Sequence, residues 1–402
     1  MSKRIFITGF GIITSIGKNA FESLDSLLKE RSGFGSLDIL QTAHHHTIPA
    51  CEIKLEDNDL HALAGVQPHM GFTRAASLGI IAAKEAIASA NLSKKEIQNS
   101  ALISATSAGG IRELEKYYYQ LKDNTQKGAF EEFVDTGNPG EHTERMAEYF
   151  GVKKQIGTIS TACSSSANAI MLGAQLIKNN RVDRAICGGA EALSKFTING
   201  FNALMILDPQ HCRPFDASRK GLNLGEGAAY IVLESEEAML ESKREPLAEL
   251  LGYANANDAF HVTASSPEGM GAYEAMRGAL ASGKVDPDQV GYINAHGTAT
   301  ENNDLSEGLA MQKLFGKNMP MFSSTKPYTG HTLAAAGSVE AAFCLMSMKE
   351  SFIFPNLNFK IAMDELNIRP EVTLQAKKNL KYVLSNSFGF GGNTSSLLFG
   401  SV

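Results

Sequence analysis

Segments of strand length alternate with segments of helical periodicity along most of the chain. The apolar run 4–13 is the first expected strand, and after residue 157 strands and helices follow one another almost without interruption. Such alternation predicts an α/β fold in which helices cover largely buried sheets. The later expected strands are 157–160, 184–187, 229–234, 248–254, 291–294, 321–323, 382–384 and 396–399, and the expected helices are 72–91, 164–179, 234–245, 272–282, 304–315 and 338–350.

The charged tract 234–245 separates two series of strands and helices. A chain of 402 residues is too long for one small core. We therefore expect two halves, 1–247 and 248–402, although no short repeat is visible and a diverged duplication is not evident from the sequence. The polar region 117–143 contains several Gly, Asp and Glu residues, which indicates a surface excursion.

Bulk composition argues against several classes of protein. A net charge of −6 gives no whole-chain attraction to nucleic acid. The five isolated cysteines argue against a disulfide framework or a structural zinc site and fit a reducing compartment. No apolar run reaches the length of a membrane span, and the first residues are typical of a strand, not of a signal peptide. We therefore expect a cytoplasmic protein without a nucleic-acid or membrane partner, and expect His44–His46 to lie in a solvated loop.

Cys163 lies at a junction between an expected strand and an expected helix. Apolar residues recur at helical spacing after it, so the thiol should lie at the N-terminus of a buried helix. Free amides and the helix dipole at that position favour the thiolate and can hold a developing oxyanion. A buried packing cysteine is the other interpretation, and this segment alone supports the two equally.

Two histidines follow strands on separate loops of small residues. His296 is flanked by Ala295 and Gly297, and His331 follows Gly330. Loops beyond strand ends carry chemistry in α/β folds. One such histidine is structural about as often as functional, but two of them beside a helix-capped cysteine indicate a site. Lys326 adds a positive charge that can orient or bias a histidine.

Four segments together resemble the β-ketoacyl-acyl-carrier-protein synthases of the elongating, Cys-His-His type, in the thiolase superfamily. The resemblance extends from near residue 4 to near residue 399, in order and at the family's spacing. Three further segments, Ile7–Gly11, Arg213–Asp216 and Gly225–Ala228, agree with it. The four segments are Thr161–Ser165, Asn294–Thr300, Lys326–His331 and Ser385–Gly392.

The resemblance implies a thiolase fold, with two packed halves that each hold a mixed five-stranded sheet between helices, and usually a dimer. It implies that Cys163 carries an acyl group as a thioester. His296 and His331 would donate hydrogen bonds to the enolate left when a malonyl unit loses carbon dioxide. The backbone amides of Cys163 and Phe390 would form the oxyanion hole, and Phe390 would gate the two half-reactions.

The resemblance also assigns further residues. Lys326 corresponds to the family's catalytic-site lysine, and Glu307 would pair with Lys326 or with a bound cation. No cofactor is required, but a monovalent cation is possible, and a solvated helix position is the alternative for Glu340. The candidate cation ligands are Asn294, Glu307, Glu340, Ser385 and Asn386. The implied substrate-binding residues are Thr298 and Thr300, which would contact the pantetheine arm, and Phe388, Gly389 and Gly391.

Departures from the family pattern concern the partner and the substrate. The segment 63–69 is nearly uncharged, with only Arg74 nearby, where many members carry a basic cluster for the acidic acyl carrier protein. Met205 stands where an arginine is frequent, and the run Cys163–Ser166 is common in polyketide synthases. These features favour a specialised synthase for a polyene, polyketide or modified fatty acid over a general elongase. The expected partners are an acyl carrier protein and a second chain, identical or related.

Rival interpretations differ at single positions. A degradative thiolase would carry a second cysteine in the C-terminal glycine loop, where 388–390 reads Phe-Gly-Phe. A priming synthase would carry Asn where this chain has His331. A non-catalytic partner subunit that sets chain length would have lost the nucleophile, and Cys163 is present.

Overall fold

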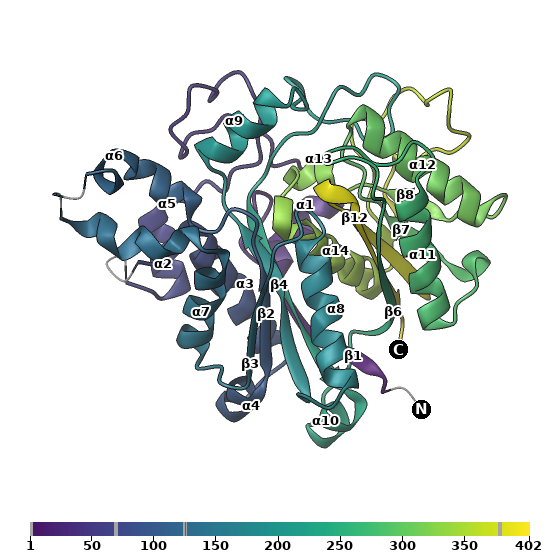
Figure 1. Ribbon diagram of the computed structural model, residues 1–402. Helices are drawn as coiled ribbons and strands as arrows, with labels where there is room; N and C mark the ends of the chain where they lie inside the picture. The colour runs from purple at the N-terminus through teal and green to yellow at the C-terminus, as the bar shows by residue number, and fades with distance from the viewer. Residues whose placement is uncertain (1–2, 68–70, 124, 126, 377–379) are drawn as a thin grey trace.

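A computed structural model describes residues 3–67, 71–123, 125, 127–376 and 380–402. Its main feature is one mixed sheet of ten strands in the order β3-β2-β4-β5-β1-β6-β12-β11-β7-β8 (Figure 1). A separate pair joins β9 (Phe352–Ile353) to β10 (Gln375–Ala376). The strands of the large sheet are β1 Ile5–Thr14, β2 Ala101–Ala105, β3 Gln155–Ile159, β4 Arg184–Glu191, β5 Gly227–Ser235, β6 Ala248–Asn257, β7 Tyr292–Asn294, β8 Met321–Ser323, β11 Tyr382–Phe388 and β12 Asn393–Gly400.

The large sheet consists of two groups of five strands. In the first group β2 is parallel to β3 and β4, and β5 is antiparallel to β4 and β1. In the second group β7 is parallel to β8 and β11, and β12 is antiparallel to β11 and β6. The groups are joined only where β1 meets β6, at the pairs Phe6–Glu249 and Ile7–Ala248. The expected mixed strands in two groups of five are confirmed, but the two groups join into one sheet.

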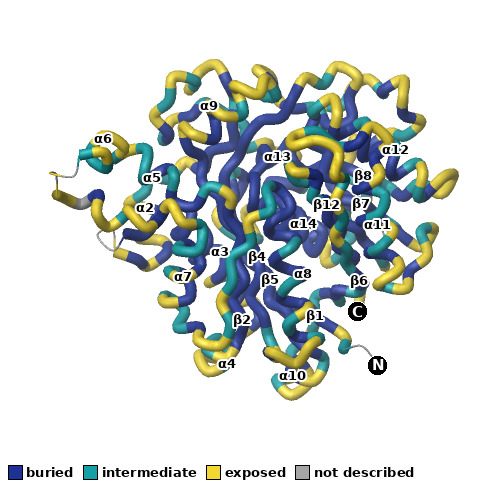
Figure 2. The backbone as a smooth tube through the Cα atoms, in the orientation of Figure 1, coloured by how far each residue is buried: buried dark blue, intermediate teal, exposed yellow. Residues whose placement is uncertain are grey.

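Helices cover both faces of each group, as expected. Helices α8 (Ser165–Lys178) and α14 (Ala336–Glu350) lie between the two groups, and α14 is buried from Ala336 through Ser347, so it forms the centre of the molecule (Figure 2). Helices α3 (Arg74–Ser89) and α7 (Pro139–Phe150) cover the first group, and α11 (Met270–Gly283) covers the second beside α12 (Glu301–Phe315).

Close packing of β1 on α3 explains the two glycines near the start of the chain. A Cβ at Gly11 would lie 2.2 Å from the carbonyl oxygen of Ala82, and one at Gly9 would lie 2.6 Å from that of Ala86. The two glycines therefore allow the close contact between helix and strand. The loop His44–His46 lies near the surface, as expected.

Two differences from the expected elements concern the first half. Strand β2 was not expected, although it lies between β3 and β4. The region 117–143 is exposed at Tyr118 and Tyr119, where it projects from the body in Figure 1, but its end begins α7, and there His142 and Thr143 are buried. The remaining helices are α1 Ala20–Leu28, α2 Asp57–Ala64, α4 Lys94–Asn99, α5 Ile111–Lys116, α6 Tyr118–Leu121, η2 Ala129–Gly137, α9 Lys195–Ala203, α10 Glu236–Glu241, η3 Pro287–Gln289, α13 Lys326–Thr329, η4 Leu333–Ala335 and η5 Phe390–Gly392.

Within the described ranges, no helix has the length and apolar character needed to cross a bilayer.

Candidate active site

A cavity of about 370 Å³ brings the three expected reactive residues together. Cys163 comes from the first half of the chain, and His296 and His331 come from the second. The other expected residues on its wall are Thr298, Thr300, Phe388, Gly389 and Phe390. Gly391 does not line the cavity: it is exposed, and its N–H donates to the carbonyl oxygen of Val262 at 2.8 Å. Its neighbour Gly392 lines the cavity instead.

Cys163 lies on a tight turn between β3 and α8. The preceding Ala162 has a φ of +53°, a left-handed conformation that is uncommon for a residue with a side chain. The Ser165 hydroxyl holds the turn, because it accepts from the Thr161 N–H at 2.8 Å and donates to the Ala162 carbonyl oxygen at 2.5 Å. Cys163 is 6% exposed and lines the cavity.

The resting state of the thiol differs from the expectation. Burial raises the pKa of the Cys163 thiol to about 12, against the smaller opposing effects of the Lys326 charge and the Phe390 backbone N–H. The helix N-terminus was expected to favour the thiolate, but removal from water has the larger effect. At neutral pH the resting group is therefore the thiol.

His296 is fixed from both sides. The carboxylate of Glu307 accepts from the backbone N–H of His296 at 2.9 Å and from that of Gly297 at 2.8 Å. The Lys326 ammonium lies 3.3 Å from His296 Nδ1 and donates to the His296 carbonyl oxygen at 2.5 Å. Because an ammonium group can only donate, Nδ1 accepts, and the neutral ring carries its proton on Nε2.

His331 has the same tautomer for a different reason. Its Nδ1 accepts from the Leu333 N–H at 3.2 Å, so the ring N–H is again on Nε2. Its ring centroid lies 5.3 Å from that of His296, with the planes at 83°. Burial, and after it the Lys326 charge, hold the pKa of both imidazoles well below the usual value. The cavity thus contains two neutral imidazoles that can each donate a hydrogen bond.

Lys326 pairs with Glu340, not with Glu307. The Lys326 ammonium donates to Glu340 Oε1, and both side chains are 3% exposed. The alternative of a solvated helix position for Glu340 is therefore wrong. Among the described residues, the Glu307 carboxyl accepts hydrogen bonds from the two backbone amides and from the Asn386 side chain at 3.1 Å. Burial raises the pKa of Glu307 and of Glu340 to about 7 each.

The five candidate cation ligands lie on neighbouring elements. Parallel pairing of β7 with β11 places Asn294 beside Ser385, and Glu307 and Glu340 lie on α12 and α14. Asn294 Oδ1 and Glu340 Oε2 are buried without a hydrogen-bond partner. Asn386 donates to Glu307 and accepts from the Ser396 hydroxyl at 2.8 Å, so its amide is already partnered. Unpartnered buried oxygens fit a hard monovalent cation, whereas no group of three or more His, Cys, Asp or Glu in the described ranges is placed to hold a metal.

The glycine loop packs directly on the nucleophile turn. A Cβ at Gly389 would lie 2.8 Å from the Thr161 carbonyl oxygen and 3.1 Å from the Cys163 nitrogen, so only glycine allows this approach. The Phe390 ring stacks on Phe201 of α9, with centroids 5.8 Å apart and planes at 17°. No local signal in the sequence indicates the contact with Phe201. Further residues that line the cavity without a sequence signal are Leu204, Ile206, Leu222, Thr263, Asn302, Asn303 and Thr394.

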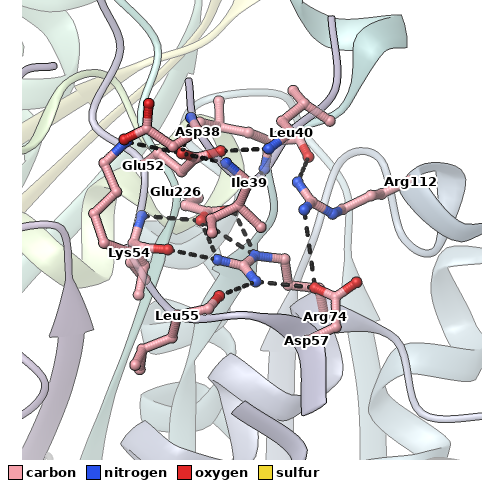
Figure 3. Close-up of polar contacts among 12 residues, drawn as sticks. Asp38, Ile39, Leu40, Glu52, Lys54, Leu55, Asp57, Arg74, Arg112 and Glu226 are labelled. Carbon is pink, nitrogen blue, oxygen red and sulfur yellow. Dashed lines mark hydrogen bonds and ion pairs between the residues drawn. The ribbon is translucent and has the colours of Figure 1, made fainter. Parts of the chain in front are cut away.

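Arg74 is not a surface charge. It is fully buried in a network with Glu226 (Figure 3), and all five guanidinium N–H groups are used. Two donate to Glu226, two to the carbonyl oxygens of Ile53 and Leu55, and one to Asp57. The only basic residue noted near 63–69 is therefore unavailable to a protein partner. Within that segment, Pro68 and His69 lie outside the described residues.

A cysteine on a strained strand-to-helix turn, two neutral imidazoles and a glycine loop in one cavity define a thiol-dependent condensing enzyme. The chain belongs to the β-ketoacyl synthase family. Residues 2–238 match the model "Beta-ketoacyl synthase, N-terminal domain" and residues 247–360 match "Beta-ketoacyl synthase, C-terminal domain". It is accordingly an acyl-transferring condensing enzyme with the thiolase fold.

Similarity to individual proteins extends over the whole chain. The 3-oxoacyl-[acyl-carrier-protein] synthase 2 of Staphylococcus aureus (strain COL) is 32% identical, with 99% of this chain and 98% of that protein covered. The structure titled "The ishigamide ketosynthase/chain length factor" superposes with a TM-score of 0.92 at 28% identity, covering 100% of both chains. A ketosynthase in complex with its chain length factor from Xenorhabdus doucetiae gives a TM-score of 0.85 at 30% identity, covering 100% of this chain and 98% of that one.

Proposed function

We propose that this protein condenses an acyl thioester with malonyl-acyl carrier protein, with loss of carbon dioxide, to give 3-oxoacyl-acyl carrier protein. The observation that supports this most is the single cavity shared by Cys163, His296 and His331. In the first half-reaction the Cys163 sulfur attacks the acyl thioester. Its proton ends on the departing carrier thiolate, so the exchange needs no net proton and is compatible with a resting thiol.

In the second half-reaction the malonyl carboxylate leaves as carbon dioxide and its bonding electrons form an enolate. His296 and His331 each present a neutral Nε2–H that can donate to the enolate oxygen. Neutral donors suit this step because the negative charge develops only in the transition state. The enolate carbon then attacks the acyl-Cys163 carbonyl carbon, and the carbon–sulfur bond breaks to release the Cys163 thiolate, which takes a proton from solvent to return to the resting thiol.

The acyl-Cys163 carbonyl oxygen needs donors of its own during both attacks. The Phe390 N–H already faces the Cys163 sulfur, where it offsets part of the rise in the thiol pKa that burial causes. The Cys163 N–H lies beside the Gly389 backbone at the same turn. We assign the oxyanion hole to these two amides, and we assign Thr298 and Thr300, whose hydroxyls lie 2.9 Å apart on the cavity wall, to the pantetheine arm.

The nucleophile is tested by comparing two cysteine variants. Cys163→Ala should abolish condensation and the acyl mass shift on the peptide that contains residue 163. Cys187→Ala is the matched control, because Cys187 is also a free buried thiol, and it does not line the cavity. A Cys163→Ala enzyme that makes 3-oxoacyl product at a near-native rate would disprove the assignment.

The histidine roles are tested by separating the half-reactions. His296→Ala and His331→Ala should each keep measurable acyl transfer to Cys163 but lose malonyl decarboxylation. Loss of one donor removes on the order of 3 kcal/mol of transition-state stabilisation, or roughly 100-fold in rate. The measurements are mass spectrometry of the acyl-enzyme and release of carbon dioxide. Decarboxylation that persists at the native rate in both variants would contradict these roles.

We propose that the working unit is a dimer, formed in the cytoplasm, with either a second copy or a related subunit. Strand β3 is at the edge of the sheet, and its Ile156 is 41% exposed, whereas the neighbouring β2 is fully buried. An exposed apolar edge strand is suited to pairing with another chain. Two of the similar structures are titled as a ketosynthase with a chain length factor, which supports a related subunit as the alternative to a second copy. The five cysteines, all free and buried, agree with a reducing compartment.

We also propose that this synthase prefers a carrier protein of its own pathway. Arg74 is buried, and Met205, 87% exposed at the cavity mouth, provides no charge. Of the three basic residues that could compensate, Lys220 is exposed on the same wall, whereas Arg213 pairs with Asp208 and Arg219 donates to the Glu301 carbonyl oxygen. Few charges should give a low association rate with a general acidic carrier and a shallow dependence on salt. Equal efficiency with both carriers, together with a steep loss on adding salt, would reject this preference.

A monovalent cation, if bound, would be held by Asn294, Ser385, Glu340 and Glu307 with surrounding oxygens, and Asn386 would orient Glu307. Its charge would stabilise the two buried carboxylates. The reaction steps above do not require it.

A further inference from the structure

Asn393 closes the glycine loop. The Gly389 N–H donates to the Asn393 carbonyl oxygen at 2.8 Å, so the loop 389–393 is joined at its base. Between these ends Gly391 and Gly392 have φ values of +83° and +80°. The outer side of the loop, η5, is bonded to the segment 257–262: the Gly391 N–H donates to the Val262 carbonyl oxygen, and Asn257 and Asp258 donate to the Gly391 and Gly392 carbonyl oxygens. The side that faces the nucleophile turn is held at the loop base.

The Asn393 side chain is a junction of three donors from other parts of the chain. Its Oδ1 accepts from the Ser164 hydroxyl at 2.6 Å, from Asn168 Nδ2 at 2.9 Å and from Asn255 Nδ2 at 2.8 Å. Ser164 and Asn168 belong to the start of α8, and Asn255 belongs to β6. One carbonyl oxygen therefore connects the loop base to the nucleophile helix and to the neighbouring strand.

The junction continues into the nucleophile turn itself. Asn168 Nδ2 also donates to the Thr161 hydroxyl at 2.9 Å. The Ser164 hydroxyl lies 2.8 Å from the Thr161 carbonyl oxygen as well, and its single proton serves either that oxygen or Asn393 Oδ1. The Ser395 hydroxyl donates to Asn168 Oδ1 at 2.7 Å, which fixes the orientation of that amide. Residues on both sides of Cys163 are thus bonded, directly or through one side chain, to Asn393.

The geometry that this junction controls is the distance between the Phe390 N–H and the Cys163 sulfur. Oxyanion donors must lie within a few tenths of an ångström of their productive position. The Phe201 stack fixes the Phe390 ring, but a ring contact does not set the direction of a backbone N–H. Asn393 and its donors are the bonds that connect the two backbone segments of the oxyanion hole.

We infer that Asn393 is a positioning residue of this enzyme, which acts with Asn168 and Asn255 to hold the glycine loop at the nucleophile turn so that the Phe390 amide can serve the acyl-Cys163 carbonyl. This inference rests on the proposed function. It predicts that disruption of the junction slows the steps that use the Cys163 oxyanion hole and leaves the histidine-supported loss of carbon dioxide unchanged.

The test compares Asn393→Leu with Asn393→Asp in the full-length enzyme. Leucine has a similar volume and no acceptor, whereas a carboxylate accepts from all three donors. We expect Asn393→Leu to lower the rate of Cys163 acylation by about 10-fold to 100-fold, with the KM for the malonyl carrier and the rate of malonyl decarboxylation within about twofold of native. Asn393→Asp should restore most of the lost acylation rate. Asn168→Leu should repeat the defect, and the double variant should be no worse than the single ones.

Other outcomes would overturn the inference. One is an Asn393→Leu enzyme that folds and acylates Cys163 at the native rate. Another is a variant that loses acylation, decarboxylation and unfolding stability together, because a merely structural role predicts that pattern. Failure of the proposed function is distinguishable, since the unmodified enzyme would then not acylate Cys163 at all.

Discussion

Two buried ion pairs, one in each half of the chain, differ in how completely their atoms are partnered. Arg74 and Glu226 are both fully buried, and every guanidinium N–H has an acceptor. Lys326 and Glu340 are nearly as buried, but Glu340 Oε2 has no hydrogen-bond partner. The first pair lies outside the cavity lining, whereas the Lys326 ammonium contacts the cavity-lining His296.

The difference separates a structural pair from a functional one. Against the effect of burial, Glu226 raises the pKa of Arg74 still further, and the pKa of Asp57 is lowered, chiefly by Lys116, so Arg74 and Asp57 both stay charged. Around Lys326, burial raises the pKa of Glu340 and Glu307 to about 7, which leaves carboxyls that change charge near neutral pH. Groups with strongly perturbed pKa values beside a cavity are typical of reactive sites.

The largest effect on stability is expected from Arg74→Met. Removal of one partner leaves Glu226 buried without its counter-charge, which should lower the free energy of unfolding by about 3–5 kcal/mol. The matched control is Arg277→Met, because Arg277 pairs with Glu274 on the exposed face of α11, and a surface pair contributes at most about 1 kcal/mol. Urea unfolding at pH 7 measures both. A loss below 1 kcal/mol for Arg74→Met would show that the buried network is not structural.

Lys326→Met should instead lower activity, by on the order of 100-fold or about 2.7 kcal/mol, because His296 loses the donor that fixes its tautomer. Lys317→Met is the control, since Lys317 is exposed beyond the end of α12. Condensation rates measure the effect. The comparison of the two pairs fails if Lys326→Met is as destabilising as Arg74→Met and its remaining folded enzyme is fully active.

Stability of the Lys326→Met variant should also depend on pH. Without the ammonium, the folded-state pKa of Glu340 rises further, while its unfolded value stays near 4.5. A carboxyl with a raised folded pKa binds more protons when folded, so its contribution to stability is lost as pH rises. The deficit relative to the native enzyme should therefore be larger at pH 8.5 than at pH 6. A deficit that is constant over this range would show that Glu340 does not neutralise.

Glu307→Gln tests the same effect of burial on a carboxyl that forms no ion pair with Lys326. The pKa of Glu307 is raised from 4.5 to about 7, so between these values the folded protein binds more protons than the unfolded chain. The native free energy of unfolding should therefore fall, by up to about 1.4 kcal/mol per pH unit from this group, as pH rises from 5 to 7. The Gln variant lacks this slope, and the difference curve should level off above pH 7. Parallel stability curves for the two proteins would contradict the burial effect.

The sequence predicted the fold where local patterns determine it. Helix α8 and strands β4, β6 and β8 follow from apolar periodicity, and β8 has the expected bounds. Strand β2, Ala101–Ala105, was missed because five residues with only Leu102 and Ile103 as large apolar side chains show no alternation, and its place between β3 and β4 comes from pairing with distant strands.

The sequence predicted which residues form the site but not which of them pair with one another. Small residues around Cys163, His296 and His331 indicated that they were reactive, and the cavity brings them together. The pairing of Lys326 with Glu340 instead of Glu307 depends on how α14 and α12 pack, which spacing along the chain does not reveal. The pKa of the thiol depends on burial depth, and the Asn393 junction joins segments more than 100 residues apart.

The smallest expected effect concerns the unpartnered oxygens near the second pair. If a monovalent cation binds Asn294 Oδ1 and Glu340 Oε2, potassium or sodium should raise the free energy of unfolding by about 1 kcal/mol. The reference is an equal concentration of tetramethylammonium, because that ion is too large for a compact oxygen site. Urea unfolding at constant ionic strength measures this without recourse to activity. Asn294→Leu removes one oxygen and should abolish the difference between salts, whereas the exposed Lys317→Met should preserve it. Equal stability of the native enzyme in all three salts would mean that water, not a cation, bonds to these two oxygens. The two ion pairs would then differ in hydration and not in ion binding.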